Sequence, residues 1–173
     1  MENVNITGYY PGVAGEVTRL HAVYYHEHWG FDLSFETQVG TELSRFLASM
    51  APWDGFWAAR DPAGRFLGSV AVDGGQEQGA RLRWFIVDPA FQGRGLGRRL
   101  LSRAVEFSQN AGHESLFLWT FAGLDPARRL YESFGFALAE EHEARQWGNL
   151  IREQRFVRPG VPVKRLDPGP GRL

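Results

Sequence analysis

Three glycines at alternate positions, Gly93, Gly95 and Gly97, constrain the fold of this chain more than any other feature. They follow an apolar run over residues 82–87 and precede a long amphipathic segment that starts at Leu96. Because glycine has no Cβ, its backbone N–H can approach an anion closely, and the N-terminus of a helix adds further N–H groups at the same place. The pattern therefore predicts a strand, a loop and a helix that together bind a pyrophosphate.

Charge and hydropathy exclude several kinds of partner. The chain has 173 residues, enough for one domain with a sizeable core, and a formal net charge of −1. A basic surface for nucleic acid is missing, whereas Gln92, Arg94, Arg98 and Arg99 form a local patch suited to a small polyanion. No segment approaches the roughly 20 apolar residues of a membrane span, and no signal segment opens the chain. We expect a cytoplasmic protein with no nucleic-acid or membrane partner.

The chain contains no cysteine. This excludes disulfides, thiolate metal sites and a cysteine nucleophile. His26 and His28 form an H-x-H pair, but no further ligands follow at metal-like spacing, so we expect no metal site. The chemistry of the protein must therefore use oxygen and nitrogen acids and bases.

Hydrophobic periodicity predicts a mixed α/β sandwich with the element order β-α-α-β-β-β-α-β-α-β-β. Strands are expected over residues 3–9, 56–59, 66–72, 80–87, 115–121, 136–143 and 149–157. Helices are expected over residues 11–29, 33–50, 96–111 and 126–134. Residues 1–157 then form one domain, and the Pro- and Gly-rich residues 158–173 form an irregular tail.

Two motifs point to a known family. The first, Gln92-Gly93-Arg94-Gly95-Leu96-Gly97, follows Val87-Asp88-Pro89, and the second spans residues 127–136, Ala-Arg-Arg-Leu-Tyr-Glu-Ser-Phe-Gly-Phe. They resemble the motifs Gln/Arg-x-x-Gly-x-Gly/Ala and Ala-x-x-x-Tyr-x-x-x-Gly-Phe of the GNAT superfamily of N-acetyltransferases, in the same order and separation. The resemblance covers about residues 3–157. Three short segments are similar, more narrowly, to acetyltransferase domains fused to MarR-type regulators: residues 25–35, 82–83 and 118–120.

The resemblance implies a mixed sheet of about six or seven strands, mostly antiparallel and splayed at a central parallel pair, with about four flanking helices. It implies that acetyl-coenzyme A lies in the splayed gap, with its pyrophosphate on the N–H groups of residues 93–98. Tyr131 is implied as the acid that protonates the departing thiolate, since a phenol with a pKa of about 10 stays protonated at neutral pH. The implied coenzyme A contacts are Phe85, Ile86, Val87, Gln92, Gly93, Arg94, Gly95, Leu96, Gly97 and Arg98.

One position departs from the family. Many relatives carry a glutamate six residues before the valine of Val-x-Pro, where it deprotonates the incoming ammonium, but this chain has Arg81 there. Strand alternation places Arg81, Arg83, Phe85 and Val87 on one face. Guanidinium groups cannot take up a proton near neutral pH, but they bind carboxylates and phosphates, which favours an acceptor amine with an anionic group. Ion pairs of both arginines with neighbouring Asp or Glu are the alternative.

Another residue, or water, must then act as the base. Glu27, His28 and Glu36 lie on or between the first two predicted helices, which line the acceptor side in the family. The alternative for each glutamate is a solvated helix face, and the alternative for His28 is packing beside Trp29. Glu141 and His142 are weaker candidates.

The sequence as a whole resembles an enzyme that transfers acetyl directly from acetyl-coenzyme A to an amine of a small molecule. We expect Trp119 to form part of the wall of the acceptor pocket, and packing in the core is the alternative. Two other functions stay open: an acyl-coenzyme A-binding or regulatory module that has lost its base, and a protein N-acetyltransferase. The second predicts an open groove between the first two helices and the last hairpin, in place of a closed pocket. A homodimer through the C-terminal hairpin is a further expectation.

Overall fold

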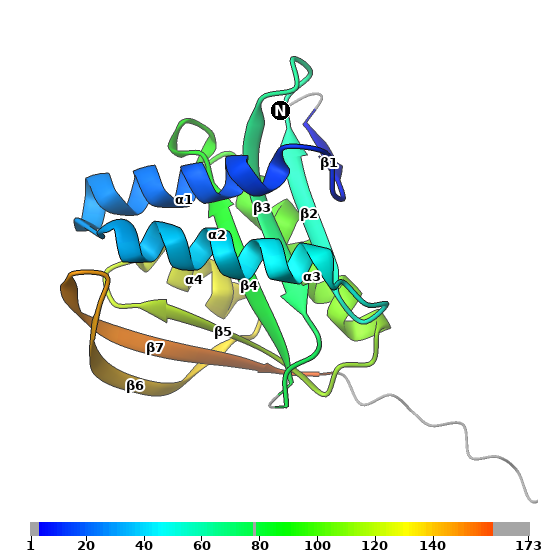
Figure 1. Ribbon diagram of the computed structural model, residues 1–173. Helices are drawn as coiled ribbons and strands as arrows, with labels where there is room; N and C mark the ends of the chain where they lie inside the picture. Colours follow the sequence, from blue (N-terminus) through cyan, green and yellow to red (C-terminus); the bar gives the residue numbers. More distant parts are fainter. Residues whose placement is uncertain (1–3, 78, 161–173) are drawn as a thin grey trace, which may run out of the picture.

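The computed structural model describes residues 4–77 and 79–160, which contain seven strands and four α-helices (Figure 1). The strands are β1 (Asn5–Thr7), β2 (Gly55–Arg60), β3 (Phe66–Asp73), β4 (Ala80–Val87), β5 (Ser115–Phe121), β6 (Ala137–Gln146) and β7 (Asn149–Pro159). The helices are α1 (Val13–Trp29), α2 (Leu33–Ala48), α3 (Leu96–Asn110) and α4 (Asp125–Ser133), and a short 3-10 turn spans Pro89–Phe91. The predicted order of strands and α-helices is confirmed.

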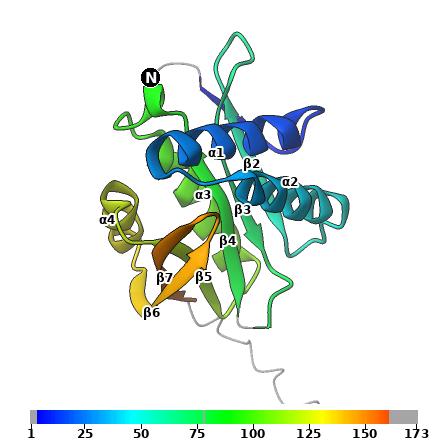
Figure 2. The same cartoon turned by 60° about the vertical axis from the view of Figure 1, so that its left-hand side comes forward.

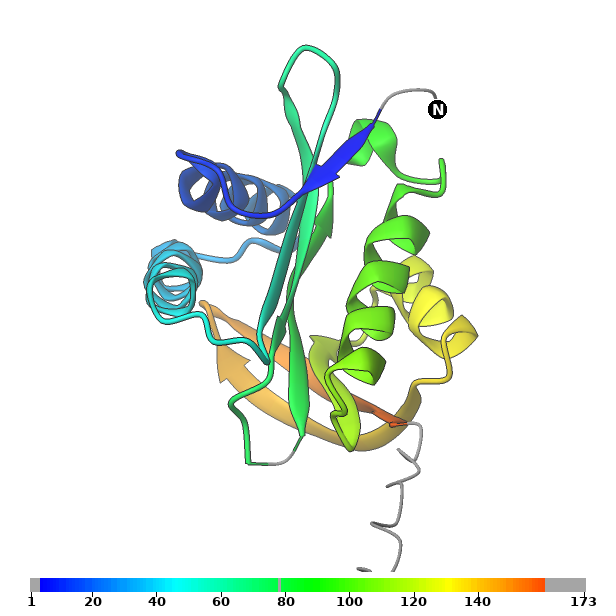
Figure 3. The ribbon, with the colours of Figure 1, turned by 90° about the vertical axis from the view of Figure 1, so that its right-hand side faces the viewer.

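All seven strands form one sheet in the order β1-β2-β3-β4-β5-β7-β6. Helices α1 and α2 cover one face, and α3 and α4 cover the other, as the end-on view shows (Figure 3). Each face has its own hydrophobic cluster, because apolar residues alternate along the central strands. Every strand pairing is antiparallel except that of β4 with β5, so the predicted mixed sheet is confirmed.

The parallel pair at the centre of the sheet is splayed. β4 and β5 pair at two positions only, Ala80 with Leu116 and Arg81 with Phe117. Beyond these positions the unit of β5, β7 and β6 turns away from β4 (Figures 1 and 2). The edge of β4 that follows Arg81 therefore has no partner strand on this side.

A β-bulge interrupts β4 immediately before its C-terminal end. Ser69 and Ala71 of β3 pair with Ile86 and Arg83 of β4, so one residue of β3 lies opposite two residues of β4. Trp84 in the bulge has a φ of 44°, which is uncommon for a residue other than glycine. The Ser69 hydroxyl donates a 2.8 Å hydrogen bond to the Trp84 carbonyl, which stabilises the bulge inside the core.

The bulge corrects the expectation that four alternate residues of this strand share a face. Arg83 and Trp84 both lie on the side of α1 and α2, with the guanidinium carbon 4.2 Å from the centre of the indole ring. Phe85 and Val87 pack instead with the cluster on the side of α3. An extra residue in a strand reverses the alternation of all residues after it, and no glycine in the sequence marks this position.

The last strand extends slightly beyond its predicted end at residue 157. β7 continues to Pro159, and the Arg158 Nε atom donates a 2.7 Å hydrogen bond to the Phe134 carbonyl. Most of the expected tail, residues 161–173, lies outside the described residues. Within the described ranges, no helix is both long and apolar enough to cross a membrane.

Candidate active site

The glycine loop joins the C-terminal end of β4 to the N-terminus of α3. Gly93 and Gly95 have φ values of 69° and 82°, a left-handed conformation that side chains with a Cβ disfavour. A Cβ added to Gly93 would meet nothing within 4 Å, so the space above this residue is open. Gly97 has a different role, because its Cβ would lie 3.4 Å from Leu130 and 3.5 Å from Phe85, where α3 packs closely against α4 and β4.

The backbone at this point fits a pyrophosphate. The Arg99 N–H donates to the Gly95 carbonyl at 3.1 Å, so the N–H groups just before Arg99 precede the first helical hydrogen bond. These donors and the positive end of the helix dipole point the same way. The side chains of Arg94 and Arg98 are exposed at the rim, whereas the Gln92 amide donates at 3.0 Å to the Val87 carbonyl and closes the turn.

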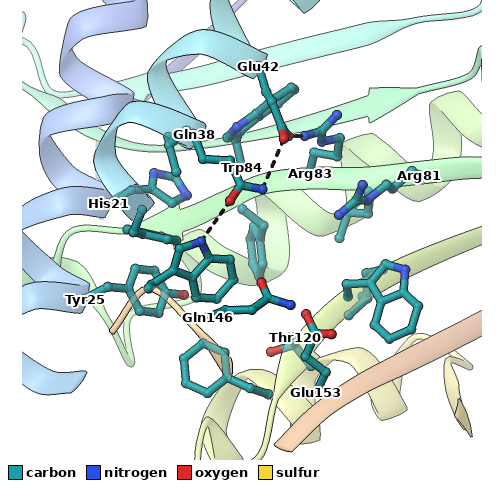
Figure 4. Close-up of a pocket in the computed structure, with 18 of the residues that line it drawn as sticks. His21, Tyr25, Gln38, Glu42, Arg81, Arg83, Trp84, Thr120, Gln146 and Glu153 are labelled. Atoms are coloured by element: carbon teal, nitrogen blue, oxygen red, sulfur yellow. Dashed lines mark hydrogen bonds and ion pairs between the residues drawn. The ribbon is translucent and has the colours of Figure 1, made fainter. Parts of the chain in front are cut away.

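A cavity of about 380 Å³ lies in the gap between β4 and β5 (Figure 4). The side chains that line it come from α1, α2, β4, β5, α4 and the β6–β7 hairpin. Its lining includes Phe85, which contacts the glycine loop at Gly97, Tyr131 of the second motif, whose ring lies 5.8 Å from that of Phe85, and Trp119 of β5. The cavity therefore joins the predicted coenzyme side of the gap to the predicted acceptor side.

Aromatic rings make up much of the acceptor side. The rings of Tyr25 and Phe35 lie 5.2 Å apart, the ring of Phe121 lies 5.8 Å from Tyr25, and the indole of Trp147 lies 5.0 Å from Phe35. All four side chains line the cavity. Such edge-to-face contacts hold the rings in fixed positions, which gives the acceptor side a rigid apolar wall.

The β6–β7 hairpin closes the cavity at the end of α1. The Trp147 carbonyl accepts a 3.1 Å hydrogen bond from the Asp32 N–H, and its indole donates one of 2.8 Å to the Gln38 side chain. The Asn149 amide donates at 3.0 Å to the Trp29 carbonyl. The sequence offered one signal for this turn, the Trp147-Gly148 pair between two strand-like runs, and both residues have positive φ values.

The two arginines of β4 have different surroundings. Arg83 forms ion pairs with Glu42 of α2 and, at 3.5 Å, with Asp73 of β3. Arg81 has no ion pair within the described residues, and its buried Nε atom has no hydrogen-bond partner there. Burial, followed by the charge of Arg83, lowers the pKa of Arg81. Ion pairing thus accounts for Arg83, while Arg81 lines the cavity and is attracted at longer range by the carboxylates of Glu42, Asp73 and Glu153.

Tyr131 lies on α4 at the junction of the gap and the core. Its side chain is buried and lines the cavity, with its ring 5.8 Å from that of Phe85. Burial raises the pKa of the phenol well above its ordinary value of 10. The group therefore stays protonated at neutral pH and can donate a proton to a leaving group in the gap.

Three residues that the sequence suggested as bases lie outside the cavity: Glu27, His28 and Glu36. All three are exposed, and the His28 Nδ1 atom lies 2.8 Å from the Tyr24 carbonyl. On α1 the cavity is lined by His21 and Tyr25, and Glu27 lies on another face of the helix. His28 shares the face of these two residues by helical spacing, but it lies in the last turn of α1, with its ring stacked 4.4 Å from that of Tyr24. This part of the prediction is not supported by the geometry.

Sequence reasoning missed several polar residues of the cavity: His21, Gln38, Glu42, Gln146 and Glu153. Glu153 had a usable signal, since it stands two positions after the buried Ile151 and so shares its strand face. Within the described residues, no group of three or more His, Asp or Glu side chains is placed to hold a metal ion.

Comparisons with known proteins agree with this geometry. The model of the acetyltransferase (GNAT) family matches residues 16–136. An uncharacterized N-acetyltransferase of Schizosaccharomyces pombe is 35% identical over 129 residues, which cover 73% of this chain and 78% of that protein. N-acetylaspartate synthetase of Xenopus tropicalis is 35% identical over 109 residues, which cover 61% of this chain but only 40% of that protein.

The fold has close counterparts among solved structures. A putative acetyltransferase of Salmonella typhimurium, solved with acetyl-CoA, has a TM-score of 0.72 at 15% identity, covering 94% of this chain and 97% of that chain. Together with the family match, the gap between β4 and β5 and the glycine loop define an acyltransferase fold. The chain belongs to the acetyltransferase (GNAT) family.

Proposed function

We propose that this protein transfers an acetyl group from acetyl-CoA directly to the amine of a small molecule that also carries an anionic group. One observation carries the proposal: Phe85, Tyr131 and Arg81, whose buried Nε atom has no hydrogen-bond partner within the described residues, line a single cavity. The thioester and a negatively charged acceptor can therefore meet in one cavity, which is the main requirement of direct transfer.

Acetyl-CoA would supply the activated acetyl group. The N–H groups of residues 93–98 would hold its pyrophosphate, and Phe85, Ile86 and Val87 would line its pantetheine arm along the unpaired edge of β4. A backbone N–H of this edge can stabilise the negative charge that develops on the carbonyl oxygen. The phenol of Tyr131 would protonate the sulfur as it leaves.

The acceptor side suits a compact anion with an apolar part. The Arg81 guanidinium would bind a carboxylate or phosphate, and the rings around Tyr25 and Trp147 would pack against the apolar part. One relative is named an N-acetylaspartate synthetase, and the product in that name is an acylated amine with carboxylates. We therefore expect amino acids and similar amines to be better acceptors than uncharged amines or polyamines.

Two alternatives receive less support. A protein N-acetyltransferase predicts an open groove between the first two helices and the last hairpin, whereas Trp147 and Asn149 join the hairpin by hydrogen bonds to α2 and to the end of α1. A module that binds acyl-CoA without catalysis requires no base, whereas the cavity contains the carboxylate of Glu153. The cytoplasmic location, the homodimer and the similarity to domains fused to MarR-type regulators stay predictions.

Calorimetry and a thiol-release assay test the proposal together. We expect saturable binding of acetyl-CoA and thiol release only with amines, fastest with those that carry a carboxylate. Binding without release on a panel of amino acids, polyamines, arylamines and lysine peptides would favour the non-catalytic module. Release with lysine peptides alone would favour the protein N-acetyltransferase, and a lack of binding at millimolar acetyl-CoA would contradict the whole assignment.

A further inference from the structure

We propose that Glu153 of β7 is the base that accepts a proton from the acceptor ammonium, and that His142 of β6 connects this carboxylate to solvent. The inference rests on the proposed function, because it names a base for that same reaction. Both residues lie on the β6–β7 hairpin, whereas Arg81, at the position where many relatives carry a glutamate base, lies on β4. Three lining side chains could in principle accept the proton, His21, Glu42 and Glu153, and their surroundings distinguish them.

His21 and Glu42 are both committed to other contacts. The His21 Nδ1 atom lies 2.8 Å from the Val17 carbonyl, and burial disfavours the cation that the imidazole would become on taking up a proton. The carboxylate of Glu42 forms an ion pair with Arg83, whereas the attraction between Glu153 and Arg81 acts at longer range. Neither group is well suited to take up a proton in the cavity.

Glu153 is held at one oxygen and available at the other. Its Oε2 atom lies 3.0 Å from the His142 Nε2 atom, and no hydrogen bond or ion pair of Oε1 occurs within the described residues. The side chain is 17% exposed, and Figure 4 shows its carboxylate reaching from β7 toward the cavity beside Thr120. Phe85 and Tyr131 line the same cavity, so an amine there can contact Glu153 and also face the predicted position of the thioester.

A chain of three side chains leads outward from Glu153. His142 is its direct partner across β6 and β7, and the His142 Nδ1 atom lies 3.7 Å from Oε1 of Glu140. Side-chain exposure rises along this chain from 17% for Glu153 to 45% for His142 and 51% for Glu140. Because imidazole has one nitrogen on each side, His142 can take a proton from Glu153 and release another to solvent. The Trp119 ring, 5.6 Å away, packs edge-on against the imidazole and fixes its position.

The proton balance follows directly. Glu153 removes one N–H proton from the ammonium, the freed lone pair forms the C–N bond, and the C–S bond breaks. Tyr131 gives its proton to the sulfur, and a second proton from the nitrogen restores the phenol. One proton per turnover therefore remains on Glu153, and it leaves through His142.

Two matched amines test the role of Glu153. Para-(aminomethyl)benzoate has an alkylamine that is protonated at neutral pH, and para-aminobenzoate has an arylamine that is not. We expect Glu153→Gln to lower kcat for the alkylamine by on the order of 10²-fold and for the arylamine by less than about threefold, because only the first needs a base. Glu143→Gln, an exposed change on the same hairpin, is the control and should leave both rates unchanged.

The outcomes separate this inference from the proposed function. Equal losses for the two amines, or no loss for either, would overturn the role of Glu153 while leaving acetyl transfer intact. Wild-type protein that binds acetyl-CoA but acetylates neither amine would instead contradict the proposed acceptor class. For His142 we expect His142→Ala to slow the alkylamine reaction several-fold, with recovery on addition of imidazole. The absence of both effects would remove His142 from the proton path.

Discussion

The indole nitrogen of Trp147 donates a 2.8 Å hydrogen bond to the side-chain oxygen of Gln38, which lies 109 residues earlier in the chain. The contact joins the turn of the β6–β7 hairpin to α2, and it sets the indole 4.9 Å from the ring of Phe31 and 5.0 Å from that of Phe35. The closed end of the acceptor cavity thus depends on a contact between two elements that are distant in sequence.

Trp147→Ala should open the acceptor side without affecting the coenzyme side. We expect KM for a small anionic amine to rise about tenfold, equivalent to about 1.4 kcal/mol, while larger amines become better acceptors. Trp147→Phe keeps a ring but loses the hydrogen bond, so its KM should lie between those of the wild type and Trp147→Ala. Steady-state kinetics with amines of increasing size would measure this, and unchanged size selectivity would contradict it. The Kd of acetyl-CoA should stay constant in all three proteins.

Arg81 and Arg83 should respond differently to the same substitution. Arg81→Met removes a cation with an unpartnered Nε atom, so KM for a carboxylate-bearing amine should rise on the order of tenfold to a hundredfold, with little change for an uncharged amine. Arg83→Met leaves the partly buried Glu42 and Asp73 without their partner, so its main effect should be a loss of about 1–3 kcal/mol in the free energy of unfolding. Kinetics and urea denaturation of both variants distinguish the roles, and a larger KM effect at Arg83 would reverse the assignment.

The sequence predicted the elements well, because their signals are local. The glycine loop, the helical period after Leu96 and the apolar runs of β4 and β5 each lie within a few residues, and β4 and β5 match their predicted bounds. The bulge at Trp84 could not be predicted in this way. Its cause is the pairing with β3 and the hydrogen bond from Ser69, which is 15 residues earlier in the chain.

The acceptor side was predicted less well than the coenzyme side. Residues 92–97 form a continuous motif, whereas the acceptor cavity gathers single residues from α1, α2, β4, β5 and β7. Glu27, His28 and Glu36 were chosen for their chemistry, but the helical faces they occupy depend on how α1 and α2 pack on the sheet. Glu153 emerged only when the register of β6 and β7 placed it beside His142.

Gly93 offers a test of the coenzyme site with a matched control. Gly93→Val places a side chain in open space at a φ of 69°, and Gly64→Val does the same at a φ of 86° in the β2–β3 turn. Each change should cost about 1–2 kcal/mol of stability through backbone strain. Only Gly93→Val should also weaken acetyl-CoA binding. We expect its Kd to rise tenfold or more, where tenfold is equivalent to about 1.4 kcal/mol. Calorimetry on both variants measures this, and equal affinities would argue against a ligand above Gly93.

Tyr131→Phe should lower kcat while preserving the Kd of acetyl-CoA. Loss of a general acid costs on the order of 10²-fold, and the aromatic ring still packs against Phe85. Because burial raises the pKa of Tyr131 and an acid acts in its protonated form, the wild-type rate should show no decline from tyrosine ionisation up to about pH 10. Rates of wild type and Tyr131→Phe across this range provide the check. A basic limb that Tyr131→Phe abolishes would contradict the buried, protonated phenol.

His21 should make the stability of the fold depend on pH. Its imidazole is completely buried on α1, and this burial lowers its pKa from 6.5 to about 4. The unfolded chain therefore binds a proton at His21 at a pH where the folded protein does not. The contribution of neutral His21 to the free energy of unfolding is intact above pH 6.5, declines as the pH falls toward 4, and is lost below pH 4. The total loss is on the order of 3 kcal/mol. His21→Phe fills the same space with an apolar ring, so its free energy of unfolding should fall less steeply over this range. Urea denaturation of both proteins at several pH values measures the difference, and parallel curves would show that His21 is not protonated on unfolding.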